Sequence, residues 1–288
     1  MKKIKLIVIA ILTSILLWVL LSLVSHRLFK PGKCEHTLKV MTYNTHGMMI
    51  GETLSAQKEM LKYINTQNAD IVCLQEVLVY NDPKLLTLET LHGAMSNYPY
   101  SYCDFKFSNN KRQFGNVVFS RYPLINQQRI PYESKSNISS QCDVVVGKDT
   151  IRLIVNHLES YKLDKKDMKL AEELSNSPVV QKVQDSDLLR HRQAKEVKRH
   201  IRKSPHPVIV VGDFNAIPLS LVYWKIKFGL HDCFLNGSFG KLGNTYRRGM
   251  FGARIDFILC SRDLTPIDCI VDEVNYSDHL PVIATIGW

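Results

Sequence analysis

The 288-residue sequence contains no internal repeat and, over residues 38–288, no linker rich in glycine, serine or proline. These absences exclude solenoid and collagen-like folds and give no sign of a boundary between soluble domains. Apolar residues make up 45% of the chain and charged residues 22%, which is not the composition of a disordered protein. We therefore expect one large folded domain over residues 38–288.

The seven cysteines form no CxxC pair, and no cysteine–histidine spacing is typical of a zinc site. Cys73, Cys260 and Cys269 fall within apolar runs that resemble β-strands. We predict that they are small buried side chains rather than members of a disulfide framework. The cysteine pattern does not assign the protein to a compartment.

The chain carries 37 Lys and Arg against 27 Asp and Glu, a net charge of +10. A charge of this sign is one signal of nucleic-acid binding. However, residues 1–36 contain six basic residues and one acidic residue, so half of the net charge lies there. The remaining 252 residues are only mildly basic, which weakens the signal.

One long hydrophobic run, residues 6–24, contains 19 residues without a charge. As an α-helix it would span about 28 Å, close to the ~30 Å hydrocarbon core of a bilayer. A cleaved signal peptide usually has an apolar region of about 7–15 residues followed by a small-residue cleavage site, and no such site follows this run. We therefore predict an uncleaved N-terminal membrane anchor over residues 1–25.

The orientation of this anchor follows from its flanks. Three basic residues precede the run and three follow it, so the positive-inside count is tied. The very short basic tail before the run favours a cytoplasmic N-terminus, which would place the folded domain outside the cytoplasm. Residues 26–37 would form a tether that reaches at most about 40 Å at ~3.3 Å per residue. We expect a single-pass membrane protein whose domain stays near the bilayer.

Strand-like and helix-like segments alternate along the folded domain. The stretch 161–185 is polar and lysine-rich, and we expect an insertion or a mobile surface helix there. The predicted strands are residues 38–43, 71–74, 116–120, 144–146, 151–156, 208–211, 255–260 and 282–286, and the predicted helices are residues 55–67, 83–95, 187–203 and 219–228.

The predicted helix 187–203 contains seven basic residues. A solvated helix face is the favoured interpretation of such a cluster, and contact with anionic lipid or nucleic acid is the alternative. The seven are Arg190, Arg192, Lys195, Lys198, Arg199, Arg202 and Lys203.

Polar residues end or interrupt six of the apolar segments. Functional side chains collect at strand ends because the sheet holds them rigidly. A single polar turn after a strand is ordinary, but six with this chemistry indicate a site. Asp256 is predicted to lie inside a strand, where a bare carboxylate needs a partner or a cation. The residues at these positions are Asn44, Glu76, Asn156, His157, Asp213, Asn215, Asp256, Asp278 and His279.

The chemistry of this set indicates a hydrolytic metal site. Carboxylate and amide oxygens without cysteine select Mg²⁺, Mn²⁺ or Ca²⁺ rather than structural zinc. Two histidines beside such a site are suited to proton transfer and to stabilising an anionic transition state. Together these groups fit in-line hydrolysis of a phosphoester.

Seven short motifs resemble, in the same order, those of the endonuclease/exonuclease/phosphatase superfamily. The resemblance covers essentially the whole chain after the tether. It implies an α/β (α+β) fold, a four-layer α/β/β/α sandwich of two mixed sheets with the site at one end, here preceded by the membrane helix. The motifs are MTYNTHG (41–47), LQEV (74–77), GNVVFSRYPL (115–124), NHLES (156–160), GDFNAIP (212–218), RIDFIL (254–259) and SDHLPV (277–282).

The resemblance also implies roles for the metal and water ligands. Glu76 would be the principal ligand of Mg²⁺ or Mn²⁺, and Asn44 and Asp278 would help to hold or orient the metal. Asp213 would activate or position the attacking water, and Asn215 would hydrogen-bond the phosphate.

The histidines would act at the phosphate. His279 would contact the scissile phosphate and be oriented by Asp256, because a carboxylate partner favours an imidazolium there. His157 is similar to the histidine of the deoxyribonuclease, sphingomyelinase and inositol-polyphosphate phosphatase branches, and its carboxylate partner cannot be identified from the sequence. Residues 245–251 form a basic and apolar loop that we expect at the rim of the site.

We therefore predict a membrane-anchored, Mg²⁺- or Mn²⁺-dependent phosphodiesterase or phosphatase. Its substrate would be a phospholipid head group, such as that of sphingomyelin or a phosphoinositide, or a nucleic acid, in which case the protein is a nuclease. The tether favours lipid, and the basic surface leaves the nuclease alternative open. The alternative from another class is an inactive, anchored binding module, which the complete set of site residues disfavours.

Overall fold

The computed structural model describes residues 34–49, 53–134, 136–161, 178–237, 243–247 and 252–288. The predicted anchor over residues 1–25, and most of the tether, lie outside these residues. Within the described part of the chain, no helix has both the length and the apolar character needed to cross a membrane.

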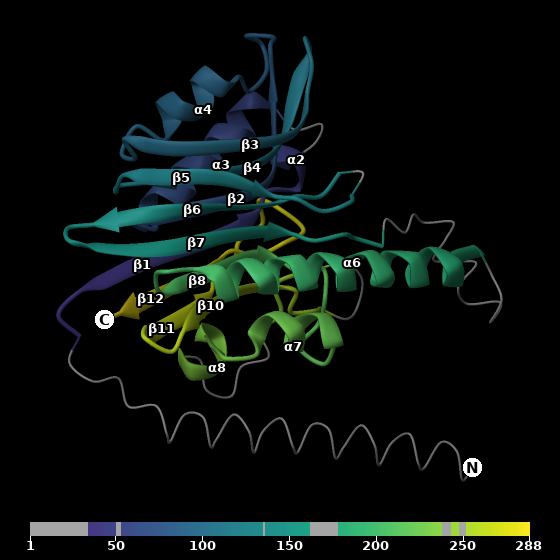
Figure 1. Ribbon diagram of the computed structural model, residues 1–288. Helices are drawn as coiled ribbons and strands as arrows, with labels where there is room; N and C mark the ends of the chain where they lie inside the picture. The colour runs from purple at the N-terminus through teal and green to yellow at the C-terminus, as the bar shows by residue number, and fades with distance from the viewer. Residues whose placement is uncertain (1–33, 50–52, 135, 162–177, 238–242, 248–251) are drawn as a thin grey trace.

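The first β-sheet has six strands in the order β11-β12-β1-β2-β4-β3 (Figure 1). β1 and β2 are parallel, and the other neighbours are antiparallel, so the sheet is mixed. Its strands are β1 (Thr37–Asn44), β2 (Ile71–Tyr80), β3 (Tyr100–Ser108), β4 (Arg112–Ser120), β11 (Thr265–Val271) and β12 (Val282–Gly287).

The second β-sheet also has six strands, in the order β5-β6-β7-β8-β10-β9. β7 and β8 are parallel and the other pairs are antiparallel. The strands are β5 (Leu124–Ile130), β6 (Ser139–Val146), β7 (Asp149–His157), β8 (Val208–Asp213), β9 (Leu230–Asp232) and β10 (Asp256–Ser261). The sequence did not predict β3, β5 or β11, because polar and exposed residues interrupt their apolar pattern. It did not predict β9 because that strand has three residues, of which one is apolar.

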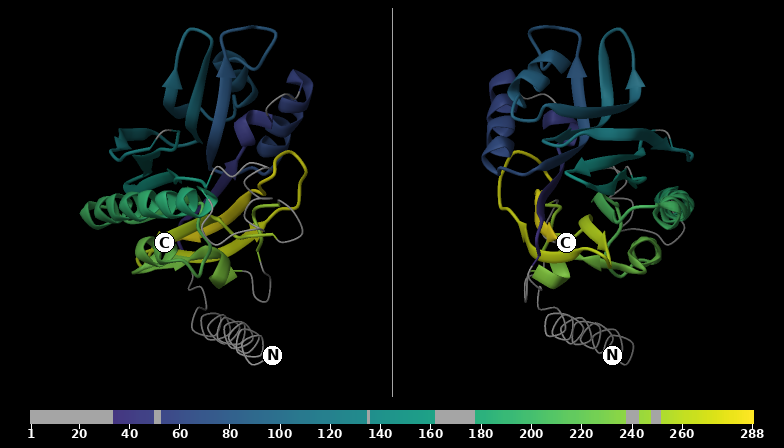
Figure 2. Two further views of the ribbon diagram at one scale, coloured as in Figure 1. Left: turned by 90° about the vertical axis from the view of Figure 1, so that its right-hand side faces the viewer. Right: turned by 60° about the vertical axis from the view of Figure 1, so that its left-hand side comes forward.

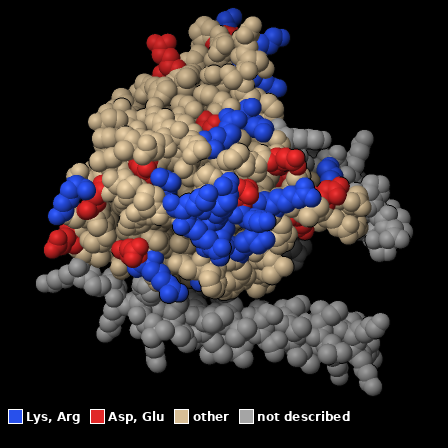
Figure 3. All heavy atoms as spheres, viewed as in Figure 1, with Lys and Arg blue, Asp and Glu red and all other residues tan. Residues whose placement is uncertain are grey.

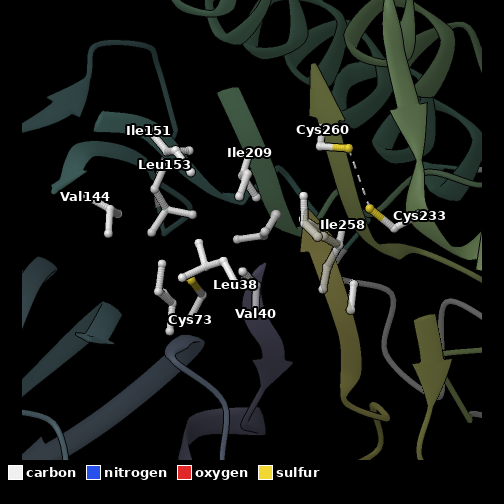
Figure 4. Packing of buried hydrophobic residues seen from close by; sticks show 14 of the residues in the cluster. Leu38, Val40, Cys73, Val144, Ile151, Leu153, Ile209, Cys233, Ile258 and Cys260 are labelled. Atoms are coloured by element: carbon white, nitrogen blue, oxygen red, sulfur yellow. Dashed lines mark hydrogen bonds between the residues drawn. The ribbon is translucent and has the colours of Figure 1, made fainter. Parts of the chain in front are cut away.

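The main hydrophobic core lies between the two sheets. Successive side chains of a strand point to opposite faces, so Leu38 and Val40 of β1 face inward together. They meet Leu153 and Ile209 of the second sheet (Figure 4). Cys73 joins this core as a fully buried side chain, as predicted.

Helices cover the outer faces of both sheets (Figure 2). The two mixed sheets with their helices form the α+β sandwich that the sequence resemblance implied. The helices over the first sheet are α3 (Leu54–Thr66) and α4 (Leu88–Ala94), those over the second are α6 (Pro178–Lys203) and α7 (Leu221–Lys227), and the short helices are α2 (His46–Met49) and α8 (Cys233–Gly237).

Side-chain caps set where several helices begin. Thr53 and Ser220 accept hydrogen bonds from the first turns of α3 and α7, which satisfies backbone donors that have no partner inside a helix. The predicted helix 83–95 was wrong over its first turn. Asp82 instead accepts a hydrogen bond from the Lys84 backbone, and Thr87 caps α4.

Helix α6 is longer than predicted, because it begins at residue 178 rather than 187. The predicted insertion 161–185 lies partly within it and partly outside the described residues. Arg190, Gln193 and Ala194 are buried, and Arg190 and Gln193 hydrogen-bond the backbone of Glu159. These three residues therefore hold the helix against the chain that leaves β7.

Candidate active site

Three strand ends of the second sheet place polar side chains at one end of the inter-sheet core. His157, Asp213 and Asp256 continue the inward-facing rows of β7, β8 and β10. In register, His157 lies opposite Asp213, and Asp213 lies opposite Asp256. The same alternation that fills the core with apolar side chains therefore brings these three together.

The first sheet contributes Asn44 at the end of β1 and Glu76 on β2. The β2–β4 register shifts between Leu74 and Val77, and Glu76 has a φ of 55°. Such a bulge redirects a side chain at a strand. The Nδ2 group of buried Asn44 is 3.1 Å from Oε1 of Glu76 and 3.0 Å from Oδ2 of Asp213, and it donates to both. Asn44 thus links the two sheets across the site.

The structure identifies a carboxylate partner for His157. Its Nε2 atom lies 3.3 Å from Oε1 of Glu76 and 4.0 Å from Oδ2 of Asp213. Burial lowers the pKa of His157 below its ordinary value, and the charge of Glu76 opposes this only in part. His157 is therefore mainly uncharged at neutral pH. The sequence could not reveal Glu76 as the partner, because the two residues come from different sheets.

His279 has the opposite charge state. Its Nδ1 atom is 2.9 Å from Oδ2 of Asp256, and its Nε2 atom is 3.8 Å from Oδ2 of Asp213. Burial alone lowers the pKa of His279, but Asp256 and Asp213 outweigh burial and raise the pKa to about 10. His279 is therefore an imidazolium at neutral pH, and the pairing with Asp256 that the resemblance implied is present.

Asp213 is almost fully buried and accepts several hydrogen bonds. The backbone N–H of Asn215 donates to its Oδ1 atom at 2.7 Å, and the Asn215 side chain donates to Oδ2 at 3.2 Å. Burial raises the pKa of Asp213 to about 7, and the charge of Asp256 adds to the rise. A carboxyl group that titrates near neutrality is suited to exchange a proton with water.

Asp278 lies beside these residues, but it contacts a different partner. Its Oδ1 atom is 3.2 Å from Nδ1 of His46, and the hydroxyl of its neighbour Ser277 donates to the backbone oxygen of Asn44 at 2.9 Å. His46 lies in the MTYNTHG motif, but no role for it was predicted from the sequence. Its φ of 48° is a backbone conformation that the sequence does not predict for a histidine.

The predicted rim loop reaches the site at Tyr246. The ring of Tyr246 is 4.8 Å from the ring of His279, and the hydroxyl of Thr245 accepts hydrogen bonds from the backbone of Ile255 and Asp256. These contacts confirm the predicted position for residues 245 and 246. Residues 248–251 of the loop lie outside the described part of the chain.

The donor atoms fit a hard divalent cation. Ligand atoms of Asp213, Asp256 and His279 lie within 4.8 Å of one another, but a protonated imidazole cannot bind a metal, so this trio is better described as an ion-paired group. Glu76 is 24% exposed at its side chain, and its Oε2 atom takes part in none of the contacts described above. The carboxylate of Glu76, with the oxygens of neighbouring residues, is a donor set that Mg²⁺ prefers.

A sequence model of the Endonuclease/Exonuclease/phosphatase family matches residues 41–279. No curated protein matches the chain.

Solved structures of similar fold cover most of the chain. An endonuclease/exonuclease/phosphatase from Beutenbergia cavernae is 19% identical, with a TM-score of 0.67 over 88% of this chain and 72% of that one. Truncated Caenorhabditis elegans TDP2 is 19% identical, with a TM-score of 0.63 over 88% and 98%. D. rerio TDP2 complexed with single strand DNA product is 16% identical, with a TM-score of 0.65 over 88% and 100%. At these identities the similarity establishes the fold.

Proposed function

Because this chain belongs to the endonuclease/exonuclease/phosphatase family, we propose that it is a divalent-metal-dependent hydrolase of phosphoester bonds. One observation carries the proposal: a buried imidazolium, His279, lies beside the carboxylate of Asp213 at the end of both sheets. This arrangement offers a positive donor for a phosphate oxygen next to a proton acceptor for water.

Glu76 would hold the divalent cation, Mg²⁺ or Mn²⁺, with Asn44 and Asp278 helping to hold or orient it. When bound, such a cation polarises the phosphoryl group and offsets its negative charge. The contact with Asn44 supports the metal-binding role of Glu76, because the Asn44 amide donates to Oε1 of Glu76 and does not occupy Oε2. Asp278 is tied to the same corner through Ser277 and the Asn44 backbone.

Asp213 would position the attacking water and accept its proton as the new phosphorus–oxygen bond forms. Asn215 would orient Asp213 through its backbone N–H, and its side-chain amide would donate to the phosphate the hydrogen that otherwise reaches Oδ2 of Asp213. His279 would donate Nε2–H to a phosphate oxygen, where negative charge grows in the transition state, while Asp256 holds the opposite ring nitrogen. His157 would donate its Nε2–H to the phosphate in place of Glu76, whose carboxylate would then hold the cation.

We propose further that residues 1–25 anchor the protein in a membrane, with the domain outside the cytoplasm. The 19-residue uncharged run supports this proposal. A bilayer near the site favours a phospholipid head group as substrate. The second candidate function is a nuclease, which is supported by the similarity in fold to D. rerio TDP2 complexed with single strand DNA product.

The test is a substrate panel assayed with the full chain in detergent or vesicles. The panel would contain phospholipid phosphodiesters, phosphomonoesters and single-stranded and duplex DNA, each with and without Mg²⁺ or Mn²⁺. We expect chelation to abolish hydrolysis and Asp213→Asn to lower kcat by about 10²–10⁴. Asp82→Asn, at an exposed turn, is the matched control and should retain the wild-type rate. Wild-type hydrolysis of every active substrate by Asp213→Ala would refute the mechanism.

Salt dependence separates the two candidate substrates. Binding of nucleic acid should weaken steeply as salt rises, because it releases counterions. Hydrolysis of an uncharged or zwitterionic lipid head group should change little. Accessibility of the domain to an added protease in sealed, oriented vesicles would test the proposed topology.

A further inference from the structure

Helix α7 and the loop before it expose an unusual amount of apolar surface. Leu219 and Leu221 are each 73% exposed, and Phe228 is 72% exposed. Trp224 is 47% exposed between them. The opposite side of the same helix is also apolar, because Val222, Tyr223 and Ile226 are buried against the second sheet. α7 therefore exposes apolar side chains on its solvent face, next to the exposed Lys225, and also buries apolar side chains on its core face.

These exposed side chains form one ridge rather than a scatter. Leu221, Trp224 and Phe228 recur at spacings of three and four residues, which places them on one helical stripe. Outside this ridge, the most exposed large apolar side chain in the described part of the chain is Leu188 at 53%. Single exposed apolar residues are normal on soluble proteins, but a continuous apolar ridge marks an interaction surface.

The neighbouring helix α6 displays a basic stripe beside this ridge. Its exposed residues Arg192, Lys195, Arg199 and Arg202 lie at i, i+3, i+7 and i+10, on one side of the helix. Lysine and arginine side chains gather over α6 in the centre of the face shown in Figure 3. Acidic side chains offset this charge only in part, as in the ion pair between Glu196 and Arg199.

The ridge and the stripe belong to one surface. α6 and α7 lie side by side over the second sheet (Figures 1 and 2). The Nζ group of Lys198 in α6 donates to the backbone oxygen of Ile226 at 3.2 Å and to that of Phe228, at the end of α7. Lys225 and Lys227 add positive charge along the ridge itself, and Lys227 Nζ lies 5.1 Å from the ring centre of Trp224.

We propose that the α6–α7 face, meaning residues 217–228 with the exposed side of residues 192–203, docks on an anionic lipid bilayer. Leu219, Leu221 and Phe228 would enter the interfacial region, where leucine and aromatic side chains are favourable. The α6 stripe would face the negative headgroups. Nucleic acid would use the basic stripe but would leave the aliphatic side chains in water, so the bilayer accounts for more of the surface.

This inference goes beyond the proposed hydrolase activity and does not depend on it. It also places the candidate site close to lipid. Asn215 is four residues before Leu219, so the two are separated by at most about 14 Å of extended chain. A face that docks through Leu219 would therefore hold the candidate site next to the bilayer surface.

The test uses the full chain, added to vesicles, and reads the emission of Trp224. Trp18→Phe provides a background, because Trp18 lies in the N-terminal apolar run. The difference between this background and Trp18→Phe/Trp224→Phe isolates Trp224. The double variant reports Trp288, a half-buried residue whose Nε1 donates to Asp149 at 2.9 Å, as an internal control.

Vesicles would contain brominated phosphatidylcholine, with or without about one third phosphatidylserine. We expect Trp224 to lose about half or more of its emission with phosphatidylserine, because a docked side chain lies ~5–10 Å into the headgroup boundary, while Trp288 is unchanged. Arg192→Gln/Arg199→Gln should remove the phosphatidylserine-dependent quenching. Lys58→Gln/Lys62→Gln, on the exposed side of α3, should retain it.

Two results would overturn the proposal. One is Trp224 emission that brominated lipid quenches no more than Trp288. The other is quenching that is insensitive to both phosphatidylserine and the α6 substitutions. If a single-stranded oligonucleotide binds with an affinity that the α6 substitutions reduce, while Trp224 remains unquenched by vesicles, the surface is a nucleic-acid site instead.

Discussion

Replacing Asp256 with asparagine should lower the pKa of His279 and narrow the pH range over which this residue is charged. In the wild-type protein, Asp256 at 2.9 Å and Asp213 at 3.8 Å together overcome burial and raise the pKa of His279 to about 10. The substitution removes the closer charge and keeps the size of the side chain. Burial, which lowers the pKa of a histidine and is the largest single influence on His279, is then opposed by less negative charge, so the pKa falls.

The direction of the pH effect follows from this change. A raised pKa means that the protonated His279 persists as pH rises and is lost only near pH 10 in the wild-type protein. In Asp256→Asn the proton should be lost at least about one pH unit lower, where each unit corresponds to about 1.4 kcal/mol. If the imidazolium stabilises the transition state, kcat at a pH above the lowered pKa should fall by about 10²–10³, the usual cost of losing one such donor.

The assay is kcat/KM against pH, combined with NMR titration of the His279 ring. The matched control is Asp143→Asn, which removes another buried carboxylate that pairs with Arg152 away from the site. The control should leave the basic limb of the pH profile in place. A basic limb and a His279 titration that are the same in wild type and Asp256→Asn would refute the assigned pairing.

Three predictions concern stability, each measured by urea unfolding. Asp232→Asn should lower the free energy of unfolding by about 3–5 kcal/mol, because it leaves the buried guanidinium of Arg254, now 2.9 Å from Asp232, without a counter-ion. The double variant with Arg254→Met should recover part of this loss. Strict additivity of the two changes would contradict the pairing. Gly212→Ala should destabilise the domain strongly, since φ is +116° and the new Cβ would lie 2.0 Å from a backbone oxygen of β7; an unchanged unfolding midpoint would contradict this. Burial raises the pKa of Asp143, but hydrogen bonds from Arg152 outweigh burial and leave the pKa below its ordinary value. Its contribution to stability is therefore present above the ordinary carboxyl pKa and lost as pH falls through the lowered one, so Asp143→Asn should flatten the acid side of the midpoint–pH curve.

Much of the candidate site could be predicted from the sequence because strands impose a period of two. Once β7, β8 and β10 are recognised, the inward-facing positions nearest the site are fixed. These are His157 and Asp213 at the ends of β7 and β8, and Asp256 at the start of β10. The sandwich itself was implied by the resemblance of the motifs to those of the superfamily. What the period cannot supply is contact between sheets, and for that reason the partner of His157 was not predicted.

Local backbone geometry accounts for the other gaps. Glu76 reaches the site from a β-bulge with a positive φ, and His46 also has a positive φ. Neither feature follows from residue type, because non-glycine residues seldom adopt this conformation. The buried ion pair of Asp232 with Arg254 was not predicted for a different reason. Asp232 accepts hydrogen bonds from Arg254 and Tyr223, which join it only after the second sheet has formed.

The charged residues form two regions of opposite sign, an acidic candidate site and a basic stripe on α6. The site gathers Glu76, Asp213, Asp256 and Asp278 around a single imidazolium, so a phosphate dianion or monoanion approaching it would meet net negative charge. A bound divalent cation would reduce that repulsion. Protonation of Asp213, whose pKa is raised mainly by burial and further by Asp256, would reduce it by one charge. The exposed basic stripe on α6 lies outside this cluster, on the helix layer of the second sheet. It can attract an anionic surface but cannot neutralise the site. Different charged residues would therefore bind the metal and dock the protein on a surface.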